Sequence, residues 1–197
     1  MCGRFYIDTD DTPDELIELL NRAEVKAQRL QPGLALPRGE VRPGDPAAVI
    51  ALSRTQERSV FPMRWGFGGG TRLLINARSE TAAQKPTFRQ SMQDRRCLIP
   101  ASAYFEWDHR TKPLQKYQFQ LASSPILYLA GLYRFEADQR LPVFTILTRE
   151  AAPDIACFHN RMPIILPHHA ADDWLNRALP PEPLMQQAVT QLVWQPA

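Results

Sequence analysis

The stretch CLIPASAYFEW, residues 97–107, decides how this chain folds. Its apolar runs CLIPA (97–101) and YFEW (104–107) have the length and composition of short buried strands. We expect further short strands at CGRFYI (2–7), AAVIALS (47–53), SVFPMRWGF (59–67), LLIN (73–76), KYQFQLA (116–122), ILYLAGLYRF (126–135) and PVFTILT (142–148). Many short strands among few helices are typical of an α+β fold. We therefore predict one domain over residues 1–197, with a curled, mainly antiparallel, barrel-like β-sheet core flanked by helices.

The clearest helix signal lies in TPDELIELLNRAEVKAQ (12–28). Thr12 stands at the expected N-cap, and Glu15 completes a capping box three residues later. The sequence predicts further helices at SETAAQ (79–84), TFRQSMQDR (87–95), HHAADDWLNRAL (168–179) and PEPLMQQAVTQL (181–192). RTQE (54–57) is typical of a hairpin turn, and GGG (68–70) indicates a short flexible loop.

Composition limits the classes of function. The net charge of the 197 residues is +2 at pH 7, which excludes a highly basic nucleic-acid coat protein but allows a local basic groove. The three cysteines, Cys2, Cys97 and Cys157, are widely spaced without a CxxC pair, so we expect neither a disulfide framework nor a metal site. No apolar run approaches the ~20 residues of a membrane span, and no signal peptide is visible. These features favour a cytoplasmic monomer that needs no cofactor.

Cys2 is the first candidate for chemistry, in the segment MCGRF (1–5). If Met1 is removed, Cys2 carries a thiol and a free α-amine with an ordinary pKa of roughly 7.7–8.0. The neutral amine can attack an aldehyde to give a Schiff base, and the thiol can then close a thiazolidine ring. Alternatively, the thiolate can attack an acyl group with the amine as base. Taken alone, the residue is better explained as a buried structural cysteine.

Three further stretches place a polar residue at the edge of an apolar segment. Asn76 follows a strand in LLINARSET, Glu106 lies between aromatic residues in CLIPASAYFEW, and His159 precedes a strand in CFHNRMPIIL. Glu106 beside aromatic side chains is expected to have a raised pKa, and His159 can act as an acid or a base near neutral pH. Each also has a structural explanation: Asn76 as a helix cap, Glu106 as an ion-pair partner, and His159 as a core residue.

Together, MCGRF, INARSET, CLIPASAYFEW and HNRMP resemble, in order and spacing, the signature blocks of the SOS response-associated peptidase (SRAP) family, the abasic-site processing proteins. The resemblance covers residues 1 to about 167 and implies a single mixed α/β domain with a basic groove for single-stranded DNA. It implies that Cys2, once Met1 is removed, forms a thiazolidine crosslink with the opened sugar of an abasic site. It also implies self-removal of Met1, a lyase side activity through the Schiff base, and a place at the nucleoid in a bacterial cell.

The resemblance also suggests roles for individual residues. Cys2 is the expected nucleophile, Asn76 orients it and the opened sugar, Glu106 shuttles protons at the amine, and His159 protonates the sugar oxygen. The remaining positions are expected to hold the DNA, and they are Arg4, Arg78, Thr148 and Arg161. Because an abasic site offers no base edge, recognition depends on backbone charge and on the aldehyde.

Two departures from the family pattern affect the expected DNA footprint. The segment WGFGGGTRLL (65–74) is short and glycine-rich, so an aromatic wedge against the DNA is expected to be missing. Glu40 occupies the neighbourhood of a family asparagine and is expected to repel phosphate.

Rival functions start from the same terminal cysteine. A class II glutamine amidotransferase or another N-terminal-nucleophile hydrolase is disfavoured because the chain contains no Asn-Gly dipeptide for an oxyanion hole. A cysteine peptidase would pair Cys2 with His159. A single-strand DNA-binding module would need no Cys2 at all.

Overall fold

The stretch 97–107 forms two consecutive strands that join the two main sheets of this computed structural model, which describes residues 2–8, 10, 12–69 and 71–197. Strand β8 (Arg96–Ala101) belongs to an eight-stranded sheet and β9 (Ala103–Asp108) to a five-stranded sheet. Ser102 lies between them; its backbone N–H donates to the Tyr6 carbonyl over 2.8 Å, and its hydroxyl accepts from the Asp8 N–H over 2.9 Å. These bonds fix the point at which the chain passes from one sheet to the other.

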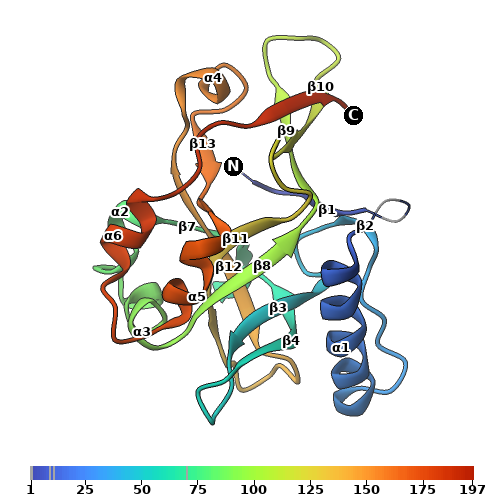
Figure 1. Cartoon of the computed structure of the whole chain (residues 1–197), viewed down its shortest axis with the longest axis vertical. Coiled ribbons are helices and arrows are strands. Elements are labelled where there is room, and N and C mark those ends of the chain that lie inside the picture. Colours follow the sequence, from blue (N-terminus) through green and yellow to red (C-terminus); the bar gives the residue numbers. More distant parts are fainter. Residues whose placement is uncertain (1, 9, 11, 70) are drawn as a thin grey trace.

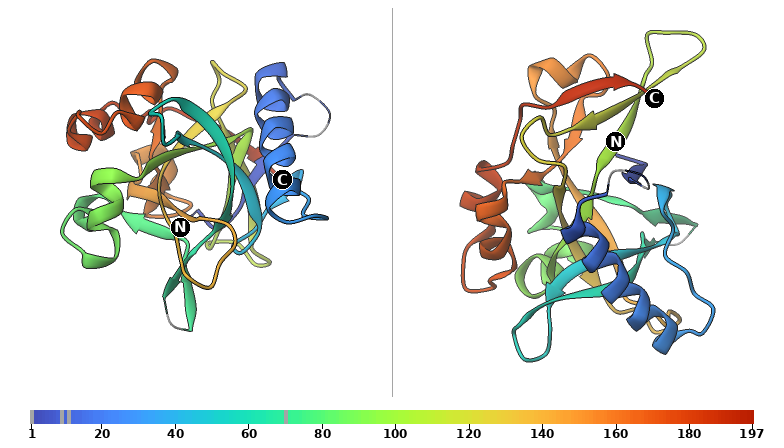
Figure 2. Two further views of the ribbon diagram at one scale, coloured as in Figure 1. Left: turned by 90° about the horizontal axis from the view of Figure 1, so that it is seen from below. Right: turned by 45° about the vertical axis from the view of Figure 1, so that its right-hand side comes forward.

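The eight-stranded sheet curls round on itself. Its strands are β8, β3 (Pro46–Leu52), β4 (Arg58–Trp65), β7 (Asn76–Arg78), β11 (Leu127–Arg134), β12 (Val143–Glu150), β13 (Arg161–Pro163) and β14 (Ile165–Leu166). Strand β12 pairs with β11 on one side and with β4 on the other, which gives the ring-like outline in Figure 2. Its pairings with β4 and β7 are parallel and the other pairings are antiparallel. The α+β prediction with a curled, mainly antiparallel sheet is therefore confirmed.

The five-stranded sheet carries the N-terminal segment. Its order is β15 (Val193–Pro196), β10 (Gln115–Gln120), β9, β1 (Phe5–Ile7) and β2 (Gly39–Val41). Strand β1 lies between β9 and β2, and the residues just before it lie in the upper half of the molecule in Figure 1. The sequence did not predict β15.

The glycine-rich segment is a strand rather than a loop. Strand β5 (Phe67–Gly69) pairs with β6 (Arg72–Leu74) as a small separate hairpin. The predicted flexible loop at 68–70 is therefore wrong for Gly68 and Gly69, and Gly70 lies outside the described residues. The Gly68 N–H donates to the Glu136 carboxylate over 2.8 Å, which anchors the hairpin. The predicted turn at RTQE is confirmed, since it connects β3 to β4.

The helices lie on the outside of the sheets (Figure 1). They are α1 (Asp14–Leu30), α2 (Ser79–Ala82), α3 (Pro86–Asp94), α4 (Pro153–Ala156), α5 (His168–Leu175) and α6 (Pro181–Gln186). Helix α1 packs on β3 and β4 through an apolar face that includes Leu16 and Leu20. The predicted capping box does not form: Pro13 is the N-cap, and the Glu15 carboxylate instead accepts from the Tyr128 hydroxyl over 2.6 Å. No described helix is long and apolar enough to cross a membrane.

Aromatic packing fills the curled sheet beneath the N-terminal segment. The Trp65 ring stacks on Phe144 at 6.1 Å and contacts Phe5 at 5.2 Å. All three side chains are fully buried. Phe5 therefore ties β1 to the core and fixes the position of the residues that precede it.

Candidate active site around Cys2

Cys2 is held at the start of the five-stranded sheet with its side chain fully buried. The Arg4 carbonyl accepts the Phe105 N–H of β9 over 3.0 Å and also faces the Cys2 thiol, whose Sγ lies 3.7 Å away. The exposed fraction of Cys2 is 0%. Pairing of the N-terminal segment with β9 therefore positions the thiol.

Asn76 fixes the backbone of Cys2 from a different sheet. Asn76 opens β7, which pairs in parallel with β12 and brings the side chain to the N-terminal segment. Its Nδ2 donates to the Cys2 carbonyl over 2.9 Å. Its Oδ1 is buried and has no hydrogen-bond partner among the residues that the structure describes. The side chain thus holds Cys2 and keeps one acceptor available beside it.

Glu106 acts on the Cys2 thiol from β9. Its exposed fraction is 3%, and burial raises the pKa of its carboxyl. Burial also raises the pKa of the Cys2 thiol, and the charge of Glu106 adds to that rise. The thiol is therefore protonated near neutral pH.

Tyr104, on the same strand, completes the buried group. It is fully buried, and its hydroxyl has no hydrogen-bond partner within the described part of the chain. Burial raises the pKa of its phenol, and the charges of Cys2 and Glu106 raise it further. The sequence reasoning passed over Tyr104, because an aromatic residue in an apolar strand is usually a core residue.

His159 lies in the turn between α4 and β13. The Arg161 N–H donates to its Nδ1 over 2.9 Å, so the neutral ring carries its proton on Nε2. Burial lowers the pKa of the imidazole, and the charges of His109 and Arg161 contribute in the same direction. A neutral ring with a proton to donate is the form present at neutral pH.

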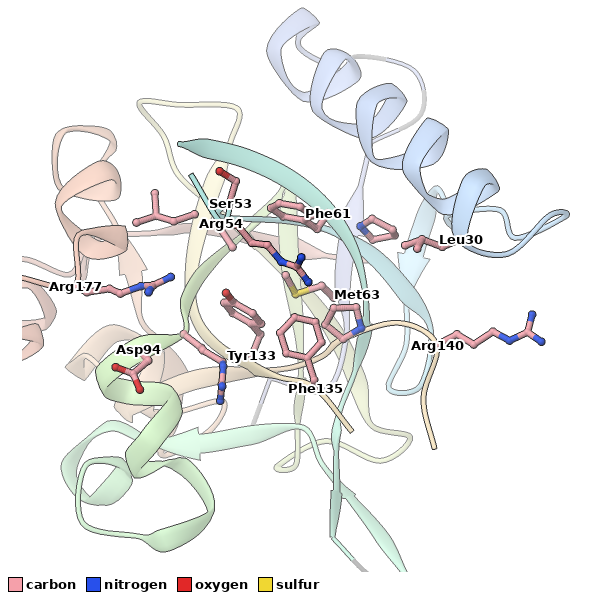
Figure 3. Close-up of a pocket in the computed structure, with 15 residues that line it drawn as sticks. Leu30, Ser53, Arg54, Phe61, Met63, Asp94, Tyr133, Phe135, Arg140 and Arg177 are labelled. Carbon is pink, nitrogen blue, oxygen red and sulfur yellow. The ribbon is translucent and has the colours of Figure 1, made fainter. Parts of the chain in front are cut away.

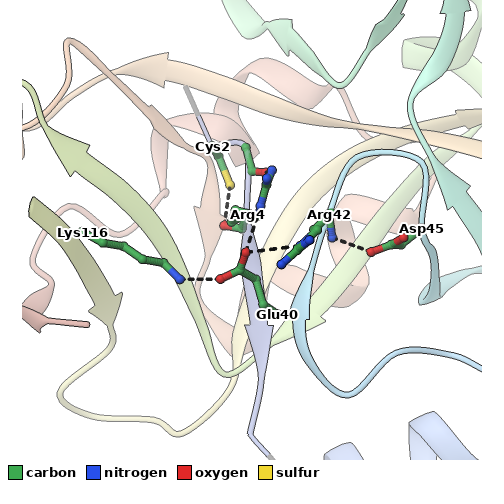
Figure 4. A network of polar contacts seen from close by, with 7 residues as sticks. Cys2, Arg4, Glu40, Arg42, Asp45 and Lys116 are labelled. Atoms are coloured by element: carbon green, nitrogen blue, oxygen red, sulfur yellow. Dashed lines mark hydrogen bonds and ion pairs between the residues drawn. The ribbon is translucent and has the colours of Figure 1, made fainter. Parts of the chain in front are cut away.

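Glu40 is surrounded by cations rather than set against the DNA as an isolated charge (Figure 4). Its carboxylate accepts from Arg4 over 2.9 Å, lies 3.5 Å from the Arg42 guanidinium, and forms an ion pair with Lys116. Burial opposes ionisation of Glu40, but hydrogen bonds from Lys116 and Arg4 outweigh it and lower the pKa of the carboxyl. The neighbouring cations therefore offset the charge of Glu40, and its expected repulsion of phosphate stays a prediction.

The predicted DNA-binding residues differ in their availability. Arg161 forms a bidentate pair with the Glu80 carboxylate over 2.7 and 2.8 Å, and it also donates to the Thr148 carbonyl. Thr148 is fully buried and its hydroxyl faces the Ala77 carbonyl at 3.4 Å, so its contact with DNA stays a prediction. Arg78, at the end of β7, has an exposed side chain.

An aromatic cluster that sequence analysis missed borders this site. The Trp194 ring of β15 packs at 5.0 Å from Phe158 and 5.6 Å from Tyr117, and 48% of Trp194 is exposed. Phe158 precedes His159, and Tyr117 pairs with Glu106 across β9 and β10. The chain therefore presents an exposed aromatic ring beside the site, from its C-terminal strand.

Cys2, Asn76 and Glu106 thus lie together, and His159 follows Phe158, whose ring packs 4.7 Å from the ring of Tyr117, the residue that pairs with Glu106. A family model described as SOS response associated peptidase (SRAP) matches residues 1–196. The chain belongs to the SRAP family. Abasic site processing protein YoaM of Bacillus subtilis is 33% identical over 195 residues, covering 89% of this chain and 79% of YoaM. Abasic site processing protein YedK of Escherichia coli is 29% identical over 185 residues, covering 91% of this chain and 81% of YedK.

Solved structures share the SRAP fold with this chain. A protein from Bacteroides thetaiotaomicron aligns over 99% of this chain and 91% of its own, with a TM-score of 0.77 and 21% identity. A phage-related protein from Bordetella bronchiseptica aligns over 100% of this chain and 94% of its own, with a TM-score of 0.75 and 24% identity. Both likenesses concern the fold alone.

The site contains side chains that can donate and accept protons, but no cluster of metal ligands among the described residues. Within residues 2–8, 10, 12–69 and 71–197, no group of three or more His, Cys, Asp or Glu side chains is arranged to hold a metal ion. What converges instead is a thiol, a carboxyl of raised pKa and an amide with a spare acceptor, and the neutral imidazole of His159 lies in the neighbouring turn between α4 and β13. These groups suit proton transfer around a nucleophile.

Proposed function

We propose that this SRAP protein processes abasic sites in single-stranded DNA, as a cytoplasmic monomer, by linking Cys2 covalently to the lesion. The observation that carries the proposal is the double restraint of Cys2: Asn76 holds its carbonyl, and its buried thiol faces the Arg4 carbonyl that β9 fixes. The names of YoaM and YedK as abasic site processing proteins support the same substrate.

The chemistry proceeds in two bond-forming steps once hydrolysis has removed Met1, which lies outside the described residues. The α-amine of Cys2 attacks the aldehyde carbon of the opened sugar, and loss of water leaves a Schiff base. The Cys2 thiol then adds to the imine carbon, and its proton passes to the nitrogen as the thiazolidine closes. No oxidant or reductant is needed, because the steps release only one water molecule.

The surrounding side chains supply the protons. Glu106, with its raised pKa, accepts a proton from the attacking amine and returns it as water leaves. His159 donates its Nε2 proton to the ring oxygen of the sugar, which opens the ring and exposes the aldehyde. The free Oδ1 of Asn76 and the Tyr104 hydroxyl are buried polar atoms that can hydrogen-bond to the opened sugar.

The state of the thiol separates this proposal from the peptidase alternative. A cysteine peptidase attacks with a thiolate, whose formation needs a lowered thiol pKa. In the chain that still carries Met1, burial and the charge of Glu106 raise the pKa of Cys2 instead. A protonated thiol suits ring closure after the amine has reacted. A lyase activity follows from the Schiff base, because the imine permits elimination of the 3′ phosphate until the thiazolidine forms.

Two variants of Cys2 test the proposal with a single-stranded oligonucleotide containing one abasic site. The wild-type protein should give an adduct that survives denaturing electrophoresis, with the mass of protein without Met1 plus DNA minus one water. Cys2→Ser keeps the amine but lacks the thiol, so it should give a Schiff base that only borohydride traps, together with more strand cleavage. Cys157→Ala, which removes an exposed cysteine, is the control and should react like the wild type. A stable adduct formed by Cys2→Ala would show that another residue is the nucleophile.

A further inference from the structure

A cavity of about 620 Å³ opens beside the β3–β4 turn (Figure 3). This turn lies at the lower end of the molecule in Figure 1. Its volume lies within the roughly 300–1,000 Å³ of sites that bind ligands or anchor side chains. The cavity shares no lining residue with the group around Cys2. It therefore needs an explanation of its own.

The floor of this cavity is apolar. Phe61 and Met63 of β4 lie beside Tyr133 and Phe135, at the end of β11 (Figure 3). The exposed fraction of Phe135 is 69%, although a large aromatic side chain normally loses most of its contact with water. The Ser53 hydroxyl is already hydrogen-bonded to Thr55 at 2.8 Å. The floor consequently offers few polar groups to a ligand.

Four arginines stand around that floor, and they are Arg54, Arg95, Arg140 and Arg177. None of them forms an ion pair with an acidic side chain among the described residues. Arg177 and Arg140 lie on opposite sides of the aromatic floor in Figure 3. Among the described residues of the lining, Asp94 alone is acidic. The rim therefore has an excess of positive charge, spread around the opening.

The arrangement selects among anionic partners. A small anion needs one or two converging cations. Positive charges spread around an apolar floor instead match a larger ligand, in which several negative groups flank one apolar side chain. Sequence-specific recognition of a nucleic-acid base would need donors and acceptors for its polar edge, and the floor supplies little beyond the Tyr133 hydroxyl. A base stacked on the Phe135 ring is the competing occupant, which the oligonucleotide competition below tests. An acidic peptide with an apolar or aromatic residue satisfies both parts of the surface.

We propose that this cavity binds an acidic segment of a partner protein, with an apolar or aromatic side chain inserted between Phe61, Met63 and Phe135 and with acidic residues paired to the surrounding arginines. The inference rests on the match between the positive arginines at the rim and the negative side chains of an acidic partner. It does not depend on the chemistry at Cys2.

Fluorescence anisotropy with a labelled peptide of four aspartates followed by leucine and phenylalanine tests this surface. The peptide should bind the full chain, and binding should weaken as salt increases. Phe135→Ala and the double variant Arg95→Ala/Arg177→Ala should each weaken binding at least tenfold. Arg38→Ala, an exposed arginine outside the cavity, should leave it unchanged. A peptide whose leucine and phenylalanine are replaced by serine should bind at least tenfold more weakly than the original.

Three results would overturn the proposal. The first is absence of binding, and the second is binding that Phe135→Ala leaves unchanged, since that exposed side chain can be removed without opening the core. The third is displacement of the peptide by a single-stranded oligonucleotide whose own binding needs Arg95 and Arg177, which would make the cavity a nucleic-acid surface. Covalent adduct formation by Phe135→Ala should match the wild type, so failure here is distinct from failure of the proposed activity.

Discussion

Burial moves the pKa values of Glu106 and His159 toward each other. The pKa of the Glu106 carboxyl rises and that of the His159 imidazole falls, in both cases chiefly because the charged form loses water. A carboxyl whose pKa rises toward neutral pH can accept a proton and return it, and an imidazole that stays neutral at that pH keeps a proton on Nε2 to donate. The two residues therefore suit the proton transfers that amine attack and sugar opening require.

Glu106→Gln should slow adduct formation. It should also flatten the acid side of the plot of the adduct-formation rate against pH. Glutamine has nearly the same shape but cannot take up a proton, so the rate change that accompanies titration of Glu106 should be lost. The measurement is the rate of adduct formation from pH 5 to pH 9, followed by denaturing electrophoresis. Glu57→Gln, in the exposed β3–β4 turn, is the control. An unchanged profile in Glu106→Gln would remove Glu106 from the proton path.

His159→Gln should change how stability depends on pH. Because the folded pKa of His159 lies below its ordinary value, the unfolded chain binds that proton more readily. The wild-type protein therefore loses stability as pH falls through the ordinary pKa of about 6.5 toward the folded value. The glutamine variant lacks this loss, so the difference in Tm, wild type minus variant, should decrease between pH 8 and pH 5. His169→Gln, on the exposed side of α5, serves as the comparison.

The sequence predicted which residues meet at this site better than it predicted what they do there. Cys2, Asn76, Glu106 and His159 each stand in a strong block, and the fold brings their blocks to one end of the molecule. The pairing of Arg161 with Glu80 joins residues 81 positions apart and leaves no local pattern. The burial of Thr148 likewise could not be predicted from the sequence, because the strands that cover β12 are distant from it in the chain.

At the scale of elements, the strands were easier to predict than their ends and caps. Apolar runs such as CLIPA marked strands correctly because burial on both faces needs continuous apolar sequence. The capping box at Thr12 failed because tertiary contacts redirected its partner: Glu15 turns to the Tyr128 hydroxyl of β11. Strand β15 was missed because its residues are exposed, and backbone pairing with β10 creates it.

Gly131 gives a test of how tightly β11 packs in the curled sheet. A Cβ at this position would lie 2.5 Å from Ile99 Cδ1 and 2.9 Å from the Thr145 carbonyl oxygen. Gly131→Ala should therefore lower the free energy of unfolding by about 1–3 kcal/mol, as overpacking in a core usually does. Urea denaturation measures this change. Gly68→Ala is the matched control, because its Cβ would meet only the movable carboxylate of Glu136 at 3.0 Å, so a larger loss in Gly68→Ala would contradict the explanation.

At the scale of the whole molecule, the charge is distributed between two ends rather than concentrated in one groove. The total is only +2, yet Arg4, Arg42 and Lys116 gather around Glu40 near Cys2, while four arginines surround the distant cavity. Several of the cations near Cys2 are already paired with carboxylates. Binding of DNA before the covalent step should consequently depend on few phosphates.

The salt dependence of non-covalent DNA binding measures the number of phosphates that the protein contacts. For Cys2→Ala and a single-stranded oligonucleotide, the logarithm of the association constant should fall against the logarithm of salt with a slope of about −1.4 to −2.1, which corresponds to two or three phosphates. Arg78→Ala should make the slope shallower by about 0.7, because its side chain is exposed at the site. A slope that Arg78→Ala leaves unchanged would place the DNA elsewhere.

The continuous run of β8 and β9 determines how far apart the two ends of the molecule can be. Arg95 lines the distant cavity immediately before β8, and Glu106 lies near Cys2 in β9. Eleven residues of extended chain span at most about 36 Å, at roughly 3.3 Å each. A damaged strand tethered at one end would leave the other end free for a second macromolecule. A single small domain could then act as an adaptor that keeps a lesion and a protein recruited to it within a few nanometres of each other.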